Sequence, residues 1–468
     1  MTTRDLLNEI FALKYFLSPV FASSKGSVSR KGPNNARASP ARNNLGSKNH
    51  QVSPTSSCPE NGPVSPNNSS ENGPSSVPVS NLVERYKFAP CGHLLAENIR
   101  TEWVRSCVLR REEPAFLFSQ MEDRGSTADA ITNLREMFLA TKELSNGKVP
   151  FIVASLAREY DNGIMPLSDC SMSNGQGGMS ISDTSMSNGK TSMSNGHSET
   201  SNHNPSQNET EIIVDDHEWR HYFSPTELTS LRGFLFVTPS CGQQLFYHWQ
   251  SQRKYWWRKF SCDPGKISVS EDAPNKTVNI QIELPFSGGS HQVMETIVNH
   301  GTGYFEQLEP GQRDAFEIKD GRKKCLPYLI ESKLSVEAAT LSLLCESLSR
   351  RGERQVMRLH RKLAPYKVAF LNSNDDELKS LAQYLYENLR QSHIHCLFSP
   401  LDAGLKSPTS IESQLSVNDR LGVPYSVLIR DSALQDGLIS IRNRDTTLEE
   451  KVHISKLNEY VESLLKNS

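Results

Sequence analysis

The stretch LAPYKVAFLNSNDDELKSLAQYLYENLR, residues 363–390, sets the fold of the last hundred residues. Its opening residues read as a strand. Asn374 can cap a helix, and Glu377 three residues later gives a capping-box-like start. Apolar residues then recur at helical spacing: Leu378, Leu381, Ala382, Leu385 and Leu389. The stretch therefore predicts a strand followed by an amphipathic helix.

The same alternation of strands and helices continues to the end of the chain. Pro424 to Arg430 reads as a buried strand. A further strand is expected after Gly437, in the segment GLISIRNRDTT, residues 437–447. A last amphipathic helix is indicated by Leu448, Val452, Leu457, Val461 and Leu464. Strands alternating with helices predict an α/β domain with a mixed sheet over residues 363–468.

Two low-complexity stretches interrupt the chain. Residues 24–80 contain no aromatic residue, and residues 168–210 contain no Leu, Val, Phe, Tyr or Trp. Neither can bury enough apolar surface to offset the entropy of ordering it. We therefore expect a leader over 1–81, a first domain over 82–349 with a disordered insert at 168–210, a basic connector over 350–362, and a terminal domain over 363–468.

The first residues resemble a mitochondrial presequence. Residues 10–59 contain no Asp or Glu but several Lys and Arg. An apolar helical face precedes this basic, Ser-rich tail: Leu6, Leu7, Ile10, Phe11, Leu13 and Phe16. This pattern predicts a mitochondrial location. The alternative is a merely disordered basic tail, because Asp5 and Glu9 are atypical of transit peptides.

The overall composition limits the possible functions. The net charge of −2 excludes a protein that coats nucleic acid through bulk positive charge, so any polyanion site must be a local patch. The nine cysteines include no C-x-x-C pair, so the sequence predicts neither disulfides nor a zinc site, and no cofactor is expected. The sequence contains no apolar run of 18 or more residues, so it predicts no membrane-spanning segment.

Residues 243–260 give the strongest nucleic-acid signal. On a helix, the apolar residues Leu245, Trp249, Trp256 and Phe260 fall on one side, which we interpret as core. Four cations occupy the rest of the helix and are candidate DNA-binding residues: Arg253, Lys254, Arg258 and Lys259. Such a face can bind phosphates without reading sequence. The alternative is a solvated basic face.

Two further basic clusters follow. The first is a turn after Asp320-Gly321, with Arg322, Lys323 and Lys324 as candidate DNA-binding residues. The second is the connector, whose cations are Arg350, Arg351, Arg354, Arg358, Arg361 and Lys362. Three separated clusters fit a duplex backbone that is contacted over a broad surface.

The terminal domain, by contrast, is acidic. Residues 363–468 carry 11 Lys or Arg and 14 Asp or Glu, a net charge of −3, which suits a protein partner better than RNA. By strand alternation, Arg442 and Arg444 share one face, and Asp445 follows at the turn. With Gly437, these are the candidate partner-interface residues. The alternative is a solvated edge strand that charge protects from aggregation.

The last hundred residues resemble the anticodon-binding domain that ends class IIa aminoacyl-tRNA synthetases. Most of the folded chain resembles the synthetase-like family of mitochondrial DNA polymerase gamma accessory subunits. The matching segments are residues 96–104, YWWRKF at 255–260, 320–323, 363–369, 437–447 and 453–457.

This resemblance implies a class II synthetase-like antiparallel-sheet domain followed by an anticodon-binding-like domain. It also implies docking on the catalytic subunit of the mitochondrial DNA polymerase, raised processivity, binding of double-stranded DNA or primer–template, and a homodimer. Vertebrate members dimerise through inserted helices, whereas the region that carries them is here short in helical pattern. That departure puts dimerisation through this particular bundle in doubt.

Catalysis is not supported by the motifs. The nearest arginine–acid pairs, Arg100-Thr101-Glu102 and Arg135-Glu136, lack the preceding Phe of the second synthetase motif, and Gln307 stands where the third motif has arginine. Without these cations the phosphates of ATP have no partner. We therefore predict a non-catalytic accessory subunit. The alternatives are a class IIa synthetase or synthetase-derived tRNA-binding protein, and a free-standing nucleic-acid-binding protein.

Overall fold

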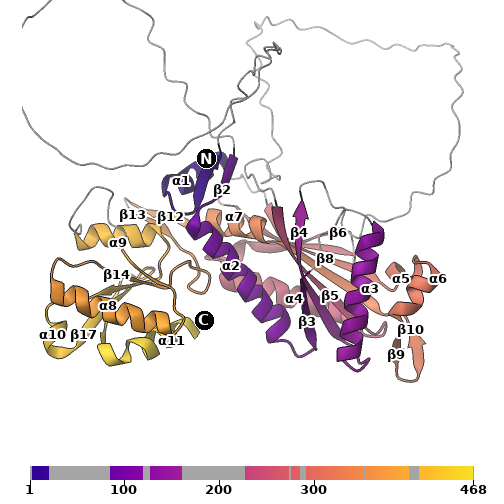
Figure 1. Ribbon diagram of the computed structural model, residues 1–468. Helices are drawn as coiled ribbons and strands as arrows, with labels where there is room; N and C mark the ends of the chain where they lie inside the picture. Colours follow the sequence, from indigo (N-terminus) through magenta and orange to yellow (C-terminus); the bar gives the residue numbers. More distant parts are fainter. Residues whose placement is uncertain are drawn as a thin grey trace, which may run out of the picture. The chain divides into compact units, whose positions relative to one another are not determined.

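The first domain is built on a seven-stranded sheet in the order β3-β4-β5-β11-β8-β7-β6 (Figure 1). The computed structural model describes residues 3–20, 85–119, 127–160, 227–273, 276–284, 291–352, 354–399 and 410–466. The strands are β3 (Ala115–Ser119), β4 (Phe151–Tyr160), β5 (Glu227–Val237), β6 (Ile267–Ala273), β7 (Thr277–Glu283), β8 (His291–Gly301) and β11 (Tyr328–Ser335). Neighbouring strands run antiparallel except β3 and β4, which confirms the predicted antiparallel-sheet domain.

Helices cover both faces of this sheet. They are α2 (Pro90–Val104), α3 (Thr127–Leu144), α4 (Gly242–Phe260) and α7 (Val336–Ser347). Phe234 and Phe236 of β5 pack with Phe138 of α3, whereas a side chain at Gly233, the residue before Phe234, would meet the rings of Trp249 and Trp103. Successive strand residues point to opposite faces, so α3 covers one face, and α4 with α2 covers the other (Figure 1).

Short elements complete the first domain. A π-helical turn, η1 (Arg105–Leu109), extends α2. Between β8 and β11 lie α5 (Gly303–Glu306), α6 (Pro310–Arg313) and the hairpin β9 (Ile318–Asp320) with β10 (Lys323–Cys325). A second hairpin, β12 (Leu348–Arg351) with β13 (Arg354–Met357), leads into the terminal domain.

The terminal domain has a five-stranded mixed sheet in the order β15-β14-β16-β17-β18. The strands are β14 (Val368–Phe370), β15 (Cys396–Phe398), β16 (Tyr425–Leu428), β17 (Leu438–Asn443) and β18 (Glu449–His453). β14 pairs in parallel with β15 and β16, and the remaining pairs are antiparallel. The helices are α8 (Asp376–Gln391), α9 (Ile411–Arg420), α10 (Ala433–Asp436) and α11 (Leu457–Lys466). The predicted α/β domain with a mixed sheet is therefore confirmed.

The sequence placed two details of this domain incorrectly. Asp375, not Asn374, caps α8, because its carboxylate accepts hydrogen bonds from the amides of Glu377 (2.9 Å) and Leu378 (3.0 Å). The last helix begins only at Leu457, since Val452 lies in β18 and Leu448 is 68% exposed. The apolar stripe from Leu448 to Leu464 therefore crosses β18 and α11 and does not form one helix.

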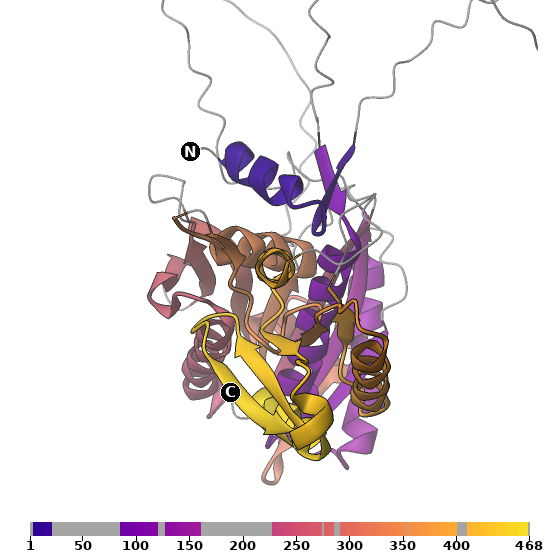
Figure 2. The same ribbon diagram turned by 90° about the vertical axis from the view of Figure 1, so that its left-hand side faces the viewer.

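Residues near the start of the chain belong to the folded body. The helix α1 (Thr3–Ala12) leads into β1 (Leu17–Val20), which pairs antiparallel with β2 (Arg85–Phe88) (Figure 2). The apolar face that suggested a presequence is buried: Leu6, Leu7, Ile10, Leu13 and Phe16. Glu9 forms a 2.9 Å ion pair with Arg350. We expected a disordered leader over residues 1–81, but residues 3–20 are folded, because their apolar side chains pack against the first domain. Their role as a presequence stays a prediction.

One surface that α1 contacts is the helix α7. Every residue of α7 is buried, as expected for a helix that is apolar on most of its circumference. α2, the sheet and α1 all contact it, and the described residues form one compact unit by their contacts. The insert at 168–210 and the rest of the predicted leader lie outside the described residues. Within the described ranges, no helix is long and apolar enough to cross a membrane.

Candidate nucleic-acid interface

The helix α4 buries its tryptophan and phenylalanine residues and presents several cations, together with Tyr247 and Tyr255, to solvent. Trp249, Trp256 and Phe260 are buried, together with Phe246 and Trp257. The interpretation of the aromatic stripe as core is therefore correct, although Leu245 is only partly buried. Aromatic rings packed in this way are not available to stack on bases.

Arg253 does not lie on the cationic surface of α4. Its side chain is only 3% exposed, and its guanidinium donates to both carboxylate oxygens of Glu295, at 2.8 to 3.1 Å. It also lies over the ring of Trp256, 4.4 Å from the centroid. Because helical position alone does not show which neighbour covers a side chain, the sequence placed this residue incorrectly among the exposed candidates.

The carboxylate of Glu295 is the centre of a buried polar network that the sequence did not indicate. It accepts further hydrogen bonds from the indole of Trp257 (2.7 Å) and the hydroxyl of Ser332. A charged group buried this completely needs such partners to offset the loss of hydration. The network therefore holds α4 onto β8 and β11.

The remaining cations of α4 are accessible. Arg258 is exposed, and Lys254 and Lys259 are partly exposed. Arg258 donates to the backbone carbonyl of Pro264 (3.0 Å), which positions its guanidinium beside the end of the helix. Two of these cations lie in the last helical turn, where the helix dipole favours positive charge. This end of α4 can bind phosphates.

The second predicted cluster forms the turn of the β9–β10 hairpin beside α5 and α6 (Figure 1). Gly321 has a φ of +61°, as the tight turn requires, and Arg322 and Lys323 are exposed. Lys324 forms an exposed 2.8 Å ion pair with Glu317. The hairpin packs through Ile318 onto the core below α3, so it forms a basic surface of its own.

The connector is not a free basic patch. Arg354 forms a 2.7 Å ion pair with Asp419 and donates to the carbonyl of Arg444 at 2.7 Å. The guanidinium of Arg358 lies 3.8 Å from Asp445, and Arg361 donates to the hydroxyl of Tyr425 at 3.3 Å. These contacts join the connector to the terminal domain, so most of its charge serves internal contacts.

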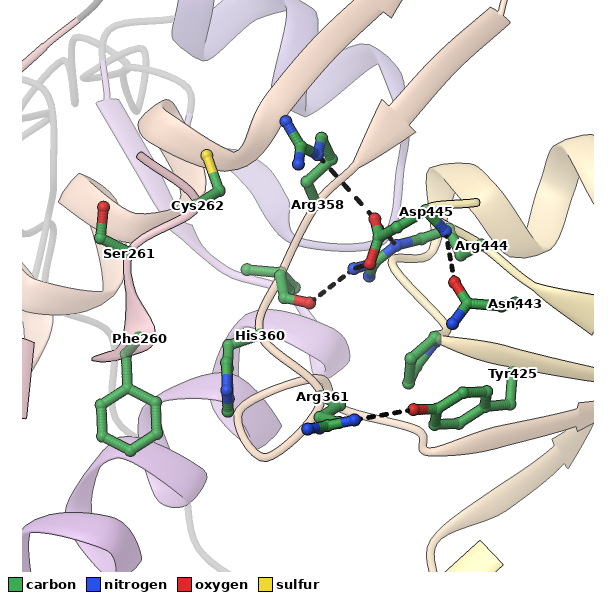
Figure 3. Close-up of a pocket in the computed structure, with 12 residues that line it drawn as sticks. Phe260, Ser261, Cys262, Arg358, His360, Arg361, Tyr425, Asn443, Arg444 and Asp445 are labelled. Atoms are coloured by element: carbon green, nitrogen blue, oxygen red, sulfur yellow. Dashed lines mark hydrogen bonds and ion pairs between the residues drawn. The ribbon is translucent and has the colours of Figure 1, made fainter. Parts of the chain in front are cut away.

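A cavity of about 250 Å³ lies where the connector meets the terminal domain and the end of α4 (Figure 3). Phe260 and Cys262 line one side, and Asn443 and Asp445 line the other. His360 packs edge-on against the ring of Phe260, with the ring centroids 5.1 Å apart. Burial, with the neighbouring cations, lowers the pKa of His360 to about 3. The structure thus brings a predicted DNA-binding helix next to the predicted partner-facing turn.

The two interface arginines are buried rather than exposed. Arg442 is 8% exposed and forms two hydrogen bonds with Asp419, at 3.0 and 3.2 Å. Arg444 is 3% exposed and donates to the carbonyls of Gly422 and Leu359, each at 2.8 Å. The expectation of an exposed arginine face is therefore wrong, because β17 lies between β16 and β18 and α9 supplies Asp419.

Of the predicted interface residues, Asp445 is the accessible one. Its carboxylate is 44% exposed and pairs with Arg444 at 3.0 Å. Gly437 has a φ of +67° where α10 ends, and a side chain there would lie 2.7 Å from the ring of His453. Gly437 is therefore required by the local backbone, whatever it contacts outside the chain.

The accessible groups of these surfaces can form ion pairs and hydrogen bonds with a charged ligand or partner. The accessible groups are permanently charged cations and one carboxylate on packed elements. Among the residues that the structure describes, no group of three His, Cys, Asp or Glu could hold a metal ion.

Comparisons with known proteins first define the class of the terminal domain. Residues 367–464 match the family described as "Anticodon binding domain". A glycine–tRNA ligase of Borreliella burgdorferi is 27% identical over 263 residues, which are 52% of this chain and 57% of that enzyme. The chain therefore combines a synthetase-like architecture with an anticodon-binding domain.

A second set of relatives is more specific. DNA polymerase subunit gamma-2, mitochondrial, of Xenopus laevis is 30% identical over 240 residues, covering 48% of this chain and 50% of the relative. Its Drosophila melanogaster counterpart is 27% identical over 246 residues, which are 50% of this chain and 66% of that relative. The chain thus spans about half to two thirds of the length of the relatives it matches. These similarities confirm the resemblance that the motifs predicted.

Proposed function

We propose that this protein is a non-catalytic accessory subunit of the mitochondrial DNA polymerase. The observation that carries the proposal is the similarity to DNA polymerase subunit gamma-2. Its 240 aligned residues are more than twice the length of the anticodon-binding match at 367–464. The likeness therefore extends into the first domain, where the motifs lead us to expect that the ATP-binding arginines of a synthetase are missing.

In this proposal, double-stranded DNA or primer–template contacts the basic surfaces of the first domain. The exposed position of Arg258 beside Lys259, and of Arg322 beside Lys323, supports this role. Phosphate contacts of this kind give affinity without sequence preference, as a processivity factor needs. Arg253 is left out of the proposed surface because its charge is used in the buried pair with Glu295.

The catalytic subunit is the proposed partner of the terminal domain, with Gly437 before β17 and Asp445 after it as the candidate contact residues. The net charge of −3 over residues 363–468 supports a protein partner rather than RNA. Arg442 and Arg444 act in this proposal by holding the turn, because their guanidinium groups contact Asp419 and the connector. We further propose a mitochondrial location in the matrix and nucleoid, supported by the relatives named mitochondrial, and a homodimer.

The direct test is primer extension by the catalytic subunit on a long single-stranded template, with and without this protein. Longer products at unchanged polymerase concentration are expected, because an added duplex contact slows dissociation. A second measurement, co-sedimentation of the two proteins, separates docking from DNA binding. Unchanged product length together with no co-sedimentation would contradict the proposal.

A second function is favoured by one observation, the similarity to glycine–tRNA ligases. In that case the protein would activate glycine with ATP. Glycine-dependent exchange of pyrophosphate into ATP measures this reaction without any tRNA. Exchange above the background of a heat-denatured sample would favour the ligase, and its absence alongside stimulated primer extension would favour the accessory subunit.

A further inference from the structure

A second and larger cavity, of about 630 Å³, lies between the first domain and the terminal domain on the other side of the connector's last residues. We call it the junction pocket. Its lining comes from the end of α2 and η1, from the residues just before β14, from the loop between α8 and β15, and from α11. Its volume is in the range of small-molecule sites.

Positive charge dominates the junction pocket. Five cations line it, Arg105, Arg110, Lys362, Lys367 and Lys466, against two carboxylates, Glu102 and Glu462. The carboxylates are already matched, since Glu102 pairs with Arg105 at 2.6 Å and Glu462 pairs with Lys466 at 2.8 Å. The cavity therefore has an excess of three cationic side chains.

The excess cations repel one another. Burial lowers the pKa of Lys362, and the adjacent ammonium of Lys259 and the guanidinium of Arg110 lower it further. Burial also lowers the pKa of Lys367, to about 7, with Arg105 acting in the same direction and Glu102 opposing it. Like charges that are held close together are stabilised by an anion placed among them.

Lys367 is also positioned to donate to such an anion. Its ammonium donates to the carbonyls of Lys362 and Ala364, both at 2.7 Å, and these two bonds fix its direction. An ammonium has three donors, so one remains for a ligand. Both carbonyls belong to the segment that joins the two domains, and Asn98 of α2 donates to the carbonyls of Leu363 and Ala364 at 2.9 and 3.1 Å. The pocket is thus built from packed elements on both sides.

We propose that the junction pocket binds the phosphate groups of a small phosphorylated molecule. Arg110, Lys362 and Lys367 are the residues that hold the phosphates, and Glu102 and Glu462 keep the flanking cations in place. A duplex backbone is a broad convex surface, whereas Lys367 is partly buried and lines the cavity. The pocket lining contains neither Arg258 of α4 nor Arg322 and Lys323 of the β9–β10 hairpin, and the site goes beyond the proposed function.

The test is isothermal titration of the full-length protein with inorganic tripolyphosphate and then with dATP at 150 mM salt. Saturable binding is expected for both. Arg110→Gln and Lys362→Gln should each weaken it about tenfold, as expected when one charged hydrogen-bond donor is lost. The matched control is Lys451→Gln, which removes an exposed cation from β18 and should leave the affinity unchanged.

Three results would overturn the proposal. The first is absence of saturable binding by the wild-type protein, and the second is equal weakening by Lys451→Gln, which would indicate bulk charge alone. The third is displacement of tripolyphosphate by a short duplex whose affinity falls equally in Arg110→Gln, which would assign the phosphates to the DNA backbone. The double variant Arg322→Glu and Lys323→Glu, on the β9–β10 hairpin and outside the pocket lining, should still bind tripolyphosphate, so a loss of DNA binding is distinguishable from a loss of the junction pocket.

Discussion

The guanidinium of Arg444 donates a 2.8 Å hydrogen bond to the backbone carbonyl of Leu359, across the boundary between the terminal domain and the connector. The same side chain donates to the carbonyl of Gly422 within the terminal domain. A residue that the sequence placed on an exposed interface therefore holds the connector against the domain. Its position next to Asp445 couples the shape of the accessible turn to this internal contact.

Replacing Arg444 should therefore affect stability first. For Arg444→Ala we expect a loss of about 2–4 kcal/mol in the free energy of unfolding, because buried carbonyls lose a charged donor. Urea denaturation followed by tryptophan fluorescence measures the change. The matched control Arg430→Ala removes a half-exposed pair with Glu449 and should cost under about 1 kcal/mol. An Arg444→Ala protein of normal stability that fails to bind the catalytic subunit would show a direct interface role instead.

The buried pair of Arg253 and Glu295 should be essential to the first domain. Glu295→Gln leaves the Arg253 charge buried without a carboxylate, and we expect a loss of about 3–5 kcal/mol. Differential scanning calorimetry should show a lower melting temperature for this variant. The variant Arg258→Gln, on the exposed side of the same helix, should melt normally. Equal melting temperatures for Glu295→Gln and the wild type would contradict the structural role.

Duplex binding should depend on the end of α4. For the double variant Arg258→Glu and Lys259→Glu we expect weaker binding and a slope of log affinity against log salt reduced by about one per removed phosphate contact. Fluorescence anisotropy with a labelled duplex at several salt concentrations gives both quantities. Lys451→Glu with Lys456→Glu makes the same charge change on the terminal domain and should have little effect. If both pairs weaken binding equally, the α4 surface has no special role.

Acid should destabilise the protein through His360. Its pKa is about 3 in the folded protein and about 6.5 when unfolded, so the unfolded state binds more protons between these values. Stability is therefore fully present above about pH 6.5 and decreases as the pH falls toward 3, by up to about 2 kcal/mol at pH 5. Urea denaturation at pH 7.5 and pH 5 should show a smaller difference for His360→Gln. An unchanged difference would indicate that other groups cause the acid sensitivity.

The segment before β1 should contribute to the core. Ile10 is fully buried, so Ile10→Ala should cost about 2–5 kcal/mol. Thermal unfolding followed by circular dichroism measures the effect. Leu144→Ala, which shortens a side chain that is 63% exposed, should cost under about 0.5 kcal/mol and serves as the control. A normal melting temperature for Ile10→Ala would mean that α1 does not pack on the body in solution.

The sequence by itself determined the class of the fold and several of its elements. Helical spacing over Leu378 to Leu389 and strand alternation from Tyr425 are local patterns, and a chain encodes them within a few residues. The aromatic stripe of α4 was likewise interpreted correctly as core, because three aromatic residues at helical spacing seldom all face water.

Only the tertiary structure determined which charged side chains are accessible to a ligand or a partner. Arg253, Arg442 and Arg444 look like surface cations in the sequence, but Glu295, Asp419 and the carbonyl of Leu359 bind them inside the fold. The carboxylate partners lie 42 and 23 residues away in the chain. Whether a cation is solvated or paired depends on which distant element covers it, and local sequence patterns carry no record of that packing. The junction pocket has the same origin, since its cations come from segments far apart in the chain.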